Sequence, residues 1–339
     1  MNRGRNNRKT KRSIPIIILL LVVIGVGLFG VRRWEQLQQA KEAEQYLMEQ
    51  EERVLPTPIV VEGQTYKLRD DLDTYLLIGL DKFSDLPGES GLSTNHQQAD
   101  FLFLIVVDHN DKSYSAIHLN RDAMTDIQRL GMSGKVIGTF TGQLALAHTF
   151  GSGGRDSCRN TAQAVSHYLL DVPVEHYFSL TMDAIPLIND LAGGVVVHID
   201  DDFSAIDPTL EQGKDVRLWG QHALTFVRSR HYVDDSSNFS RMNRQRAYLY
   251  GLHDQLVEKF GEDSRFGARL ISKLADFNVS DMTSDEMVNL AEKVKDYRFT
   301  GIRSIPGEAT LGEKYMEFYT DETALQELVM EIFFQSSAR

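Results

Sequence analysis

Short runs of apolar residues mark the strands that the sequence predicts. Asp73–Leu80, Asp100–Val107 and Tyr114–Leu119 are each too short for a typical helix and are bounded by polar or glycine-containing segments. Two further segments are interpreted in the same way: 195–199 as a strand, and Ala223–Val227 as a strand or strand end. Because the first two runs are continuous rather than alternating, we expect a sheet that is covered on both faces.

Helical spacing of apolar residues appears between and after these strands. The predicted helices are Thr161–Leu170, Ala184–Leu191, Ser240–Phe260, Ser284–Tyr297 and Glu322–Phe334. Strands that alternate with helices indicate an α/β protein, here a three-layer α/β/α sandwich with a central mixed sheet. The sequence shows no repeat and no second domain, so we assign one domain to residues 59–339. The Gly-, Ser- and Asn-rich segment 82–98 is a long loop of the kind that often carries function.

The N-terminal part of the chain has a different pattern. Ile14–Val31 contains no charged residue, which is close to the shortest length that spans a bilayer as a helix. Residues 1–13 are basic and are predicted to be cytoplasmic, which places the folded domain outside the cell as a single-pass membrane protein. Residues 32–58 are predicted to be a stalk or linker. A cleaved signal peptide is the alternative, but the sequence has no small-residue cleavage site there.

Charge limits the partners of the folded domain. The chain has a net charge of −12, and residues 1–33 contain eight basic residues and no acidic one, so the remainder carries −20. An acidic body would repel nucleic acid, and we therefore expect no nucleic-acid partner. An anionic ligand would need a local cluster of arginines or a bound cation. The single cysteine, Cys158, excludes an internal disulfide and is interpreted as a small buried residue.

The strongest chemical signal is a set of arginines in the second half of the chain. If the segment is extended, Arg228 and Arg230 share one face. Arg241, Arg244 and Gln245 have the spacing of one helix face. Guanidinium groups suit phosphate and pyrophosphate oxygens, so these residues, with Arg121 after the third strand, are candidate ligands of such a group. The alternative is that the arginines pair with acidic residues on a solvated surface.

Carboxylates at the strand ends form the second candidate group. Asp81 ends the first strand, Asp100 begins the second and Asp122 follows the third. Such carboxylates suit a hard divalent cation, and we predict Mg²⁺ bound through Asp81 and Asp100 together with a phosphate-bearing substrate. Each of these residues taken alone is more often a turn or cap residue.

The ordered motifs resemble the LytR-CpsA-Psr (LCP) family. The resemblance covers about 73–260 and rests on LLIGLD, ADFLFLIVVD, IHLNRD, LINDLAGGVVV, FVRSR and SRMNRQR. It implies a membrane-anchored extracytoplasmic α/β/α domain that transfers teichoic acid or capsular polysaccharide from a polyprenyl-pyrophosphate carrier to a peptidoglycan acceptor. It also implies that apolar faces cover the polyprenyl tail, that Asp81 and Asp100 bind Mg²⁺, and that the head-group site is lined by Arg121, Arg228, Arg230, Arg241 and Gln245.

The chain also departs from the family pattern at several positions. Gln98 and Asn120 stand where the family has arginine and proline, and Asn238 stands where it has a carboxylate. Asp234 or Asp235 is a candidate to substitute for that carboxylate and to accept the proton of an acceptor hydroxyl. These changes keep two other hypotheses open: a non-catalytic lipid-binding protein that scaffolds wall assembly, and a polyprenyl-pyrophosphate hydrolase.

Overall fold

The computed structural model describes residues 58–61, 63–80 and 94–337. The chain divides into two units, Met1–Leu55 and Pro56–Arg339, and the described residues all belong to the second. Within the described residues, no helix combines the length and apolar character that crossing a membrane requires. The predicted transmembrane helix, the basic N-terminus and nearly all of the stalk lie outside these residues.

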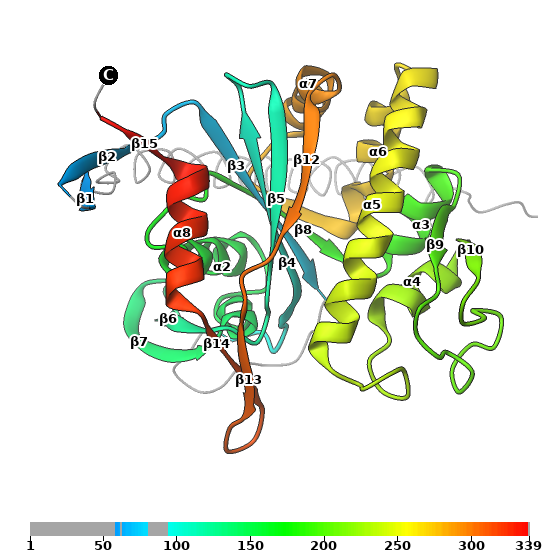
Figure 1. Cartoon of the computed structure of the whole chain (residues 1–339), viewed down its shortest axis with the longest axis horizontal. Coiled ribbons are helices and arrows are strands. Elements are labelled where there is room, and N and C mark those ends of the chain that lie inside the picture. The colour runs from blue at the N-terminus through cyan, green and yellow to red at the C-terminus, as the bar shows by residue number, and fades with distance from the viewer. Residues whose placement is uncertain (1–57, 62, 81–93, 338–339) are drawn as a thin grey trace, which may run out of the picture. The chain divides into compact units, whose positions relative to one another are not determined.

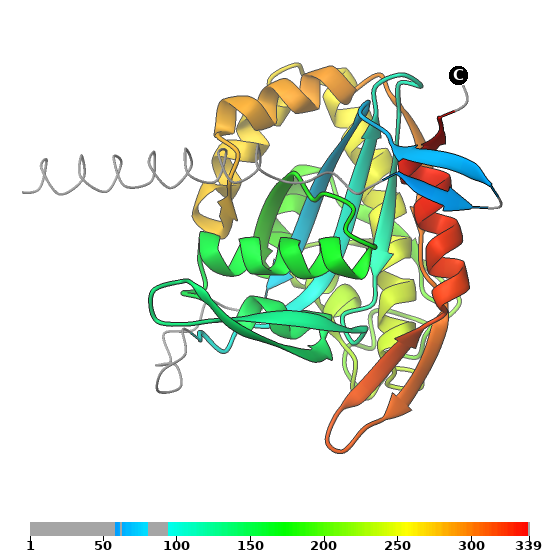
Figure 2. The same cartoon turned by 90° about the vertical axis from the view of Figure 1, so that its left-hand side faces the viewer.

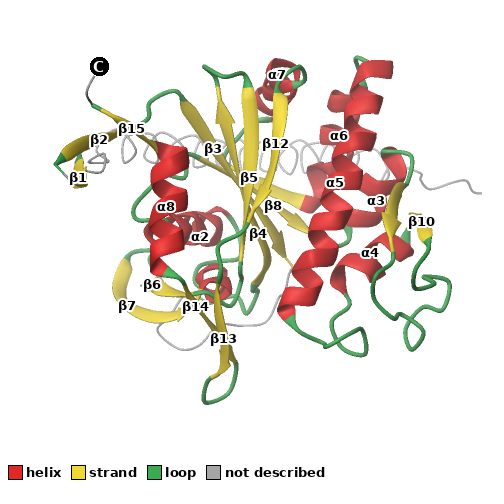
Figure 3. Ribbon diagram, viewed as in Figure 1, coloured by secondary structure: helices red, strands yellow, loops and turns green. Residues whose placement is uncertain are grey.

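A mixed sheet of six strands forms the centre of the second unit (Figure 3). Its order is β11-β8-β3-β4-β5-β12, and its strands are β3 (Leu72–Leu80), β4 (Ala99–Asp108), β5 (Ser113–Leu119), β8 (His176–Thr181), β11 (Asn278–Ser280) and β12 (Arg298–Arg303). The β3–β8 and β5–β12 pairs are parallel and the other pairs antiparallel. The central mixed sheet that the apolar runs predict is therefore confirmed.

Helices lie on both faces of this sheet (Figure 1). On one side are α2 (Arg155–Tyr168) and α8 (Glu322–Phe333), which share the main hydrophobic core with Leu76 and Leu104 of the sheet. On the other side are α3 (Ala184–Leu191), α4 (Gln221–Arg228) and α5 (Asn238–Glu262). Both faces of the sheet are apolar because helices cover both of them, which explains the continuous hydrophobic runs.

A second, smaller core lies beside α4 and α5. The two-stranded sheet of β9 (Val195–His198) and β10 (Asp215–Leu218) packs there with Phe203, Phe226 and Tyr248. Gly251 of α5 allows this contact, because a Cβ at that position would lie 2.7 Å from Val195 Cγ1. The small core therefore supports the loops at the start of α5.

The remaining elements surround this framework. They are η1 (Leu144–Thr149), η2 (Ala275–Phe277), α6 (Phe266–Leu274), α7 (Ser284–Val294), the small sheet of β1 (Ile59–Val61), β2 (Gln64–Leu68) and β15 (Phe334–Ser336), and the hairpins of β6 (Met124–Leu130) with β7 (Val136–Gln143) and of β13 (Gly307–Leu311) with β14 (Met316–Thr320). The β13–β14 hairpin extends beyond the end of α8 (Figure 2).

One predicted strand is wrong and one predicted helix begins too late. Ala223–Val227 is helical within α4, and its buried residues Ala223, Leu224, Phe226 and Val227 have helical spacing. Four apolar positions in so short a segment fit both the two-residue repeat of a strand and the 3.6-residue repeat of a helix. Packing against the smaller core stabilises the helix. The helix predicted at Thr161 starts at Arg155, where polar residues hide its first turn. The other predicted helices are confirmed to within a few residues.

Candidate functional site

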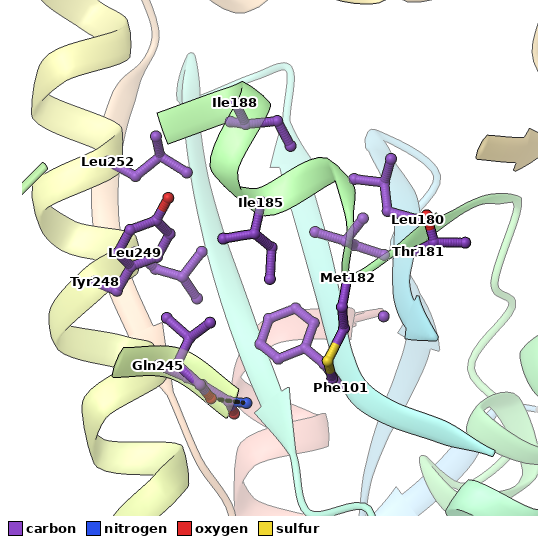
Figure 4. A pocket seen from close by; sticks show the side chains of 13 residues that line it. Phe101, Leu180, Thr181, Met182, Ile185, Ile188, Gln245, Tyr248, Leu249 and Leu252 are labelled. Carbon is purple, nitrogen blue, oxygen red and sulfur yellow. Dashed lines mark hydrogen bonds between the residues drawn. The ribbon is translucent and has the colours of Figure 1, made fainter. Parts of the chain in front are cut away.

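An apolar pocket of about 120 Å³ lies between the sheet and α3 and α5 (Figure 4). Its lining residues are Leu77, Gly79, Phe101, Leu180, Thr181, Met182, Ile185, Ile188, Val227, Gln245, Tyr248, Leu249 and Leu252. Gly79 brings β3 close to Phe101, since a Cβ there would lie 2.7 Å from the Phe101 Cβ. Gln245 lies at one end of the pocket and Leu252 and Ile188 at the other. The residue one turn before Gln245 on α5 is Arg241, so the polar end of the pocket leads toward the arginines.

Arg121 occupies the turn after β5. Its guanidinium contacts the Asp100 carboxylate, donates to Gln98 Oε1 at 2.5 Å, and has Nε 3.4 Å from Asp122 Oδ1. Burial and the positive charge of Arg230 lower the pKa of Arg121, while Asp122 opposes this shift. Arg121 is therefore held by residues of β4 and of its own turn, with another arginine nearby.

Arg241 lies in the first turn of α5 and is 7% exposed. Its Nη2 donates to Asn238 Oδ1 at 2.7 Å, and Asn238 Nδ2 donates to Asn120 Oδ1 at 2.9 Å. These amides join the start of α5 to the turn after β5. Asn238, which the family pattern would replace with a carboxylate, is thus itself the residue that orients Arg241.

Arg230 completes this group of cations. Its Nε donates to the Ser236 carbonyl at 3.1 Å, which fixes its side chain within the loop before α5. Burial, followed by the positive charges of Arg121 and Arg230, lowers the pKa of Arg241 to about 10. Arg230 acts electrostatically on both Arg121 and Arg241, and Arg121 acts on Arg241, so the three guanidinium groups belong to one charged region. We call these three residues the arginine cluster.

Polar atoms without partners are concentrated here. In the described part of the chain, four buried side-chain nitrogen or oxygen atoms have no hydrogen-bond partner, and three belong to His118, Arg121 and Arg241. Leaving a buried donor unpaired is unfavourable, and such groups point to a ligand or another function. Buried guanidinium groups with unused N–H donors are suited to a phosphate.

Arg244 and Gln245 share the helix face of Arg241, as predicted, but their hydrogen bonds run to the protein. Arg244 is 5% exposed; it contacts Asp201 and the Ser229 carbonyl and donates to Ser240 Oγ at 2.8 Å and the Phe226 carbonyl at 3.2 Å. Gln245 Nε2 donates to the Val227 carbonyl at 3.2 Å. Both residues therefore attach the end of α4 to α5 and position the loop that carries Arg230.

Arg228 is not placed as the sequence predicts. It is the last residue of α4 and is exposed, whereas Arg230 follows the extended residue Ser229 and is half-buried. The expected common strand face of these two arginines does not exist, because α4 is a helix. The residues that the structure gathers are Arg121, Arg230 and Arg241.

The two candidate carboxylates of the loop, Asp234 and Asp235, line a different cavity. This cavity of about 350 Å³ is also lined by Asp200, Asp201 and Phe239. Asp235 Oδ1 accepts from the Ser237 backbone N–H at 2.8 Å, and the hydroxyl and amide of Ser237 hold its pKa below the usual range. The carboxylate that acts on Arg241 is instead Asp122, which is 6% exposed and accepts from Gln143 Nε2 at 3.1 Å.

The predicted cation ligands are described only in part. Asp81 lies outside the described residues, and Asp100 is the second residue of β4, with its carboxylate against Arg121. Among described residues, no three histidine, cysteine, aspartate or glutamate side chains form a metal cluster. A single carboxylate beside a phosphate site still fits Mg²⁺, which uses one or two protein carboxylates and substrate phosphates.

Cys158 is buried, as predicted. Burial raises the pKa of its thiol to about 12 and lowers that of the neighbouring His148 to about 4. His148 Nε2 lies 3.8 Å from Cys158 Sγ, but both groups are neutral at neutral pH. The pair lacks the thiolate that a nucleophilic cysteine requires.

Sequence reasoning did not identify two residues that shape the site, His118 and Asp201. His118 lies in the strand before Arg121, and Asp201 pairs with Arg244. His118 has a visible signal, since it is a titratable residue in an otherwise buried strand segment. Asp201 is an ordinary loop residue until its partner is known. Asn120 was identified from the sequence, but its hydrogen bond to Asn238 was not.

Comparison with known proteins gives the same relationship in sequence and in fold. The model of the LytR_cpsA_psr family matches residues 34–332, a longer stretch than the motifs alone cover. The chain is 25% identical over 264 residues to the polyisoprenyl-teichoic acid–peptidoglycan teichoic acid transferase TagU of Bacillus licheniformis, which covers 76% of each chain. It is 26% identical over 259 residues to the TagU protein of Bacillus cereus, covering 76% of this chain and 77% of the relative.

Solved structures share the fold at lower identity. TagV of B. subtilis has a TM-score of 0.58 at 20% identity, and the match covers 78% of this chain and 97% of TagV. Protein gbs0355 of Streptococcus agalactiae has a TM-score of 0.61 at 18% identity, covering 77% and 86%. The family match spans most of the chain and the fold agrees with it, so this protein belongs to the LytR_cpsA_psr (LytR-CpsA-Psr) family.

Proposed function

We propose that this protein transfers an anionic glycopolymer, such as a teichoic acid, from a polyprenyl-pyrophosphate carrier to peptidoglycan. The observation that carries the proposal is the arginine cluster, with unpaired buried donors, at the polar end of an apolar pocket. A diphosphate joined to a lipid chain matches this site, because its phosphates suit the arginine cluster and its lipid chain suits the apolar pocket. The names of the TagU relatives, which describe transfer of teichoic acid from a polyisoprenyl carrier to peptidoglycan, support the same reaction.

The arginine cluster has a direct role in this reaction. The lipid chain enters between Phe101 and α5, and its diphosphate lies against Arg121, Arg230 and Arg241. The acceptor hydroxyl attacks the phosphorus joined to the glycan, the phosphoanhydride bond breaks, and polyprenyl phosphate leaves. Guanidinium groups fixed in advance by Gln98, Asn238 and the Ser236 carbonyl neutralise the charge that develops on the phosphate oxygens.

A carboxylate must accept the proton of the acceptor hydroxyl. Asp234 and Asp235 are exposed and line the neighbouring cavity, where we propose that the acceptor glycan binds. Asp122 is buried beside Arg121 and acts electrostatically on Arg241. We keep Asp234 and Asp235 as the proposed proton acceptors and assign Asp122 the positioning of the cluster.

Mg²⁺ would be held by Asp100 and Asp81, and when bound it would supply further positive charge to the diphosphate. Mn²⁺ serves as a spectroscopic substitute for Mg²⁺. We expect Asp100→Asn to weaken Mn²⁺ binding by about tenfold, since removing a carboxylate at or beside a metal site lowers metal affinity by about this factor. The measurement is electron paramagnetic resonance with farnesyl diphosphate present.

Asp71→Asn is the control for Mn²⁺ binding, because Asp71 also pairs with an arginine but lies at the other end of the sheet. Equal Mn²⁺ affinity in the wild type and Asp100→Asn would remove Asp100 from the cation site.

A non-catalytic function has one observation in its favour. Gln98 and Asn238 are amides at positions where the family pattern has an arginine and a carboxylate. Gln98 accepts a hydrogen bond from Arg121, and Asn238 accepts one from Arg241. Such a site can bind a carrier lipid without accelerating transfer.

We also propose, from the apolar segment 14–31 and its basic flanks, that the protein is anchored in the cell membrane with this domain outside.

The test is a transfer assay with a lipid-linked glycan donor and a peptidoglycan acceptor. The proposed function predicts glycan attached to peptidoglycan together with released polyprenyl phosphate. Released lipid phosphate without attached glycan would identify a hydrolase. Tight binding of the donor without either product would identify a carrier-binding protein, and absence of binding would exclude all three.

A further inference from the structure

His118 is a buried histidine that the mechanism above does not use. It lies on β5, three residues before Arg121, and is 2% exposed. Its Nδ1 has no hydrogen-bond partner among the described residues, although most buried polar atoms in proteins have one. A structural histidine normally satisfies its ring nitrogens within the core, so this one calls for a different explanation.

His118 has neighbours from both the apolar pocket and the arginine cluster. Its ring lies 5.0 Å from the ring of Phe101 and 5.9 Å from that of Phe103, measured between centroids. Phe101 lines the apolar pocket, and Arg241 of the arginine cluster is close enough to act electrostatically on His118. The imidazole therefore lies where the apolar pocket meets the cations.

The groups that face His118 make its polar atoms suited to an anion. From β4 they are the two phenylalanine rings, and from α5 the charged groups are Arg241 and Arg246. Burial, and then the charges of Arg246 and Arg241, lower the pKa of His118 to about 3, so the ring is neutral in the unliganded protein. An anion placed there would offset both cations and supply the missing hydrogen-bond partner.

We propose that His118 is a further binding residue of this site, which hydrogen-bonds the phosphate group attached directly to the lipid chain. The inference rests on the proposed function. Phe101 lies beside His118 and lines the pocket, so a phosphate at the end of a lipid chain held in the pocket is the one we place against His118. That phosphate is also the leaving group, and a bound phosphate raises the pKa of the imidazole, which then takes up a proton from solvent and donates to the phosphate oxygen.

The experiment measures binding of farnesyl diphosphate and of inorganic diphosphate to the purified full chain by titration calorimetry. Buffers of different ionisation enthalpy report the protons taken up on binding. We expect wild-type protein to take up protons with farnesyl diphosphate near pH 7. His118→Gln is expected to abolish this uptake and weaken farnesyl diphosphate binding about tenfold, the loss that corresponds to one hydrogen bond of a charged group.

Inorganic diphosphate is expected to distinguish the two phosphate positions. Without a lipid chain to place one phosphate against His118, its binding should change less than threefold in the variant. An equal loss for both probes would show that His118 is a general anion contact and overturn the assignment to the lipid-side phosphate.

His167→Gln is the matched control, because the His167 ring is exposed on α2 and pairs with the carboxylates of Asp126 and Asp171. If His118→Gln fails to fold, the ring nitrogen resonances of wild-type His118 give the answer, since they must shift toward the protonated form on ligand binding. Equal affinity and proton uptake in wild type and His118→Gln would overturn this inference while leaving the proposed function intact. Failure of the wild type to bind farnesyl diphosphate would instead overturn the proposed function.

Discussion

Replacing Arg241 with alanine is expected to reduce glycopolymer transfer about 100-fold or more, because one preorganised donor to a developing oxyanion has an effect of about this size. Arg241 is buried, is oriented by Asn238, and has an Nε–H without a partner in the described structure. Its donors are therefore available to a phosphate in a way that those of a surface arginine are not. The measurement is the rate of glycan transfer to peptidoglycan at saturating lipid-linked donor.

Two variants make this result specific. Arg269→Ala removes an arginine that is exposed on α6 and paired with Asp263, and it should transfer at the wild-type rate. Arg241→Lys keeps the charge but loses the forked donors, so an intermediate rate is expected. Transfer by Arg241→Ala within threefold of wild type would exclude Arg241 from the reaction and with it the phosphate-binding interpretation of the arginine cluster.

Replacing Arg244 with methionine is expected to lower the free energy of unfolding by roughly 3–5 kcal/mol, the usual effect of breaking a buried ion pair from one side. Arg244 is the most enclosed arginine of α5, and it joins Asp201, Ser240 and two backbone carbonyls at the end of α4. Methionine fills similar space but leaves Asp201 and both carbonyls without this donor. Urea unfolding followed by circular dichroism measures the change.

The matched control for Arg244 is Arg303→Met. Arg303 forms a two-pronged pair with Glu331 on the surface, and its removal should change the free energy of unfolding by less than about 1 kcal/mol. Adding Asp201→Asn to Arg244→Met should recover part of the lost stability, because no unpaired charge then remains. A stability equal to wild type in Arg244→Met would contradict the structural role and return Arg244 to the set of candidate phosphate ligands.

The contrast between these two arginines defines what the motif SRMNRQR can predict. Helical spacing correctly places Arg241, Arg244 and Gln245 on one side of α5. Spacing does not reveal that Arg244 and Gln245 donate to carbonyls at the end of α4. Nor does it reveal that Arg241 donates to the Asn238 amide and lies under the influence of Asp122 and other cations. The roles differ because they depend on which partner lies opposite each side chain.

The sequence by itself determined the long elements and the chemical class of the site. Continuous apolar runs are sufficient to identify β3 and β4, since strands covered on both faces are rich in apolar residues. The concentration of arginines against an acidic background was also sufficient to indicate an anionic ligand. These are properties of composition and local period, which need no knowledge of neighbours.

Only the tertiary structure decided which residues form the site. Asn120 bonds to Asn238, 118 positions away, and Arg121, in the turn after β5, acts electrostatically on Arg241 of α5. It likewise decided that Ala223–Val227 is a helix and that His118 lies between the apolar pocket and the arginine cluster. Burial and hydrogen bonding depend on contacts between distant segments, and these contacts determine whether a charged side chain supports the fold or is available to bind a phosphate.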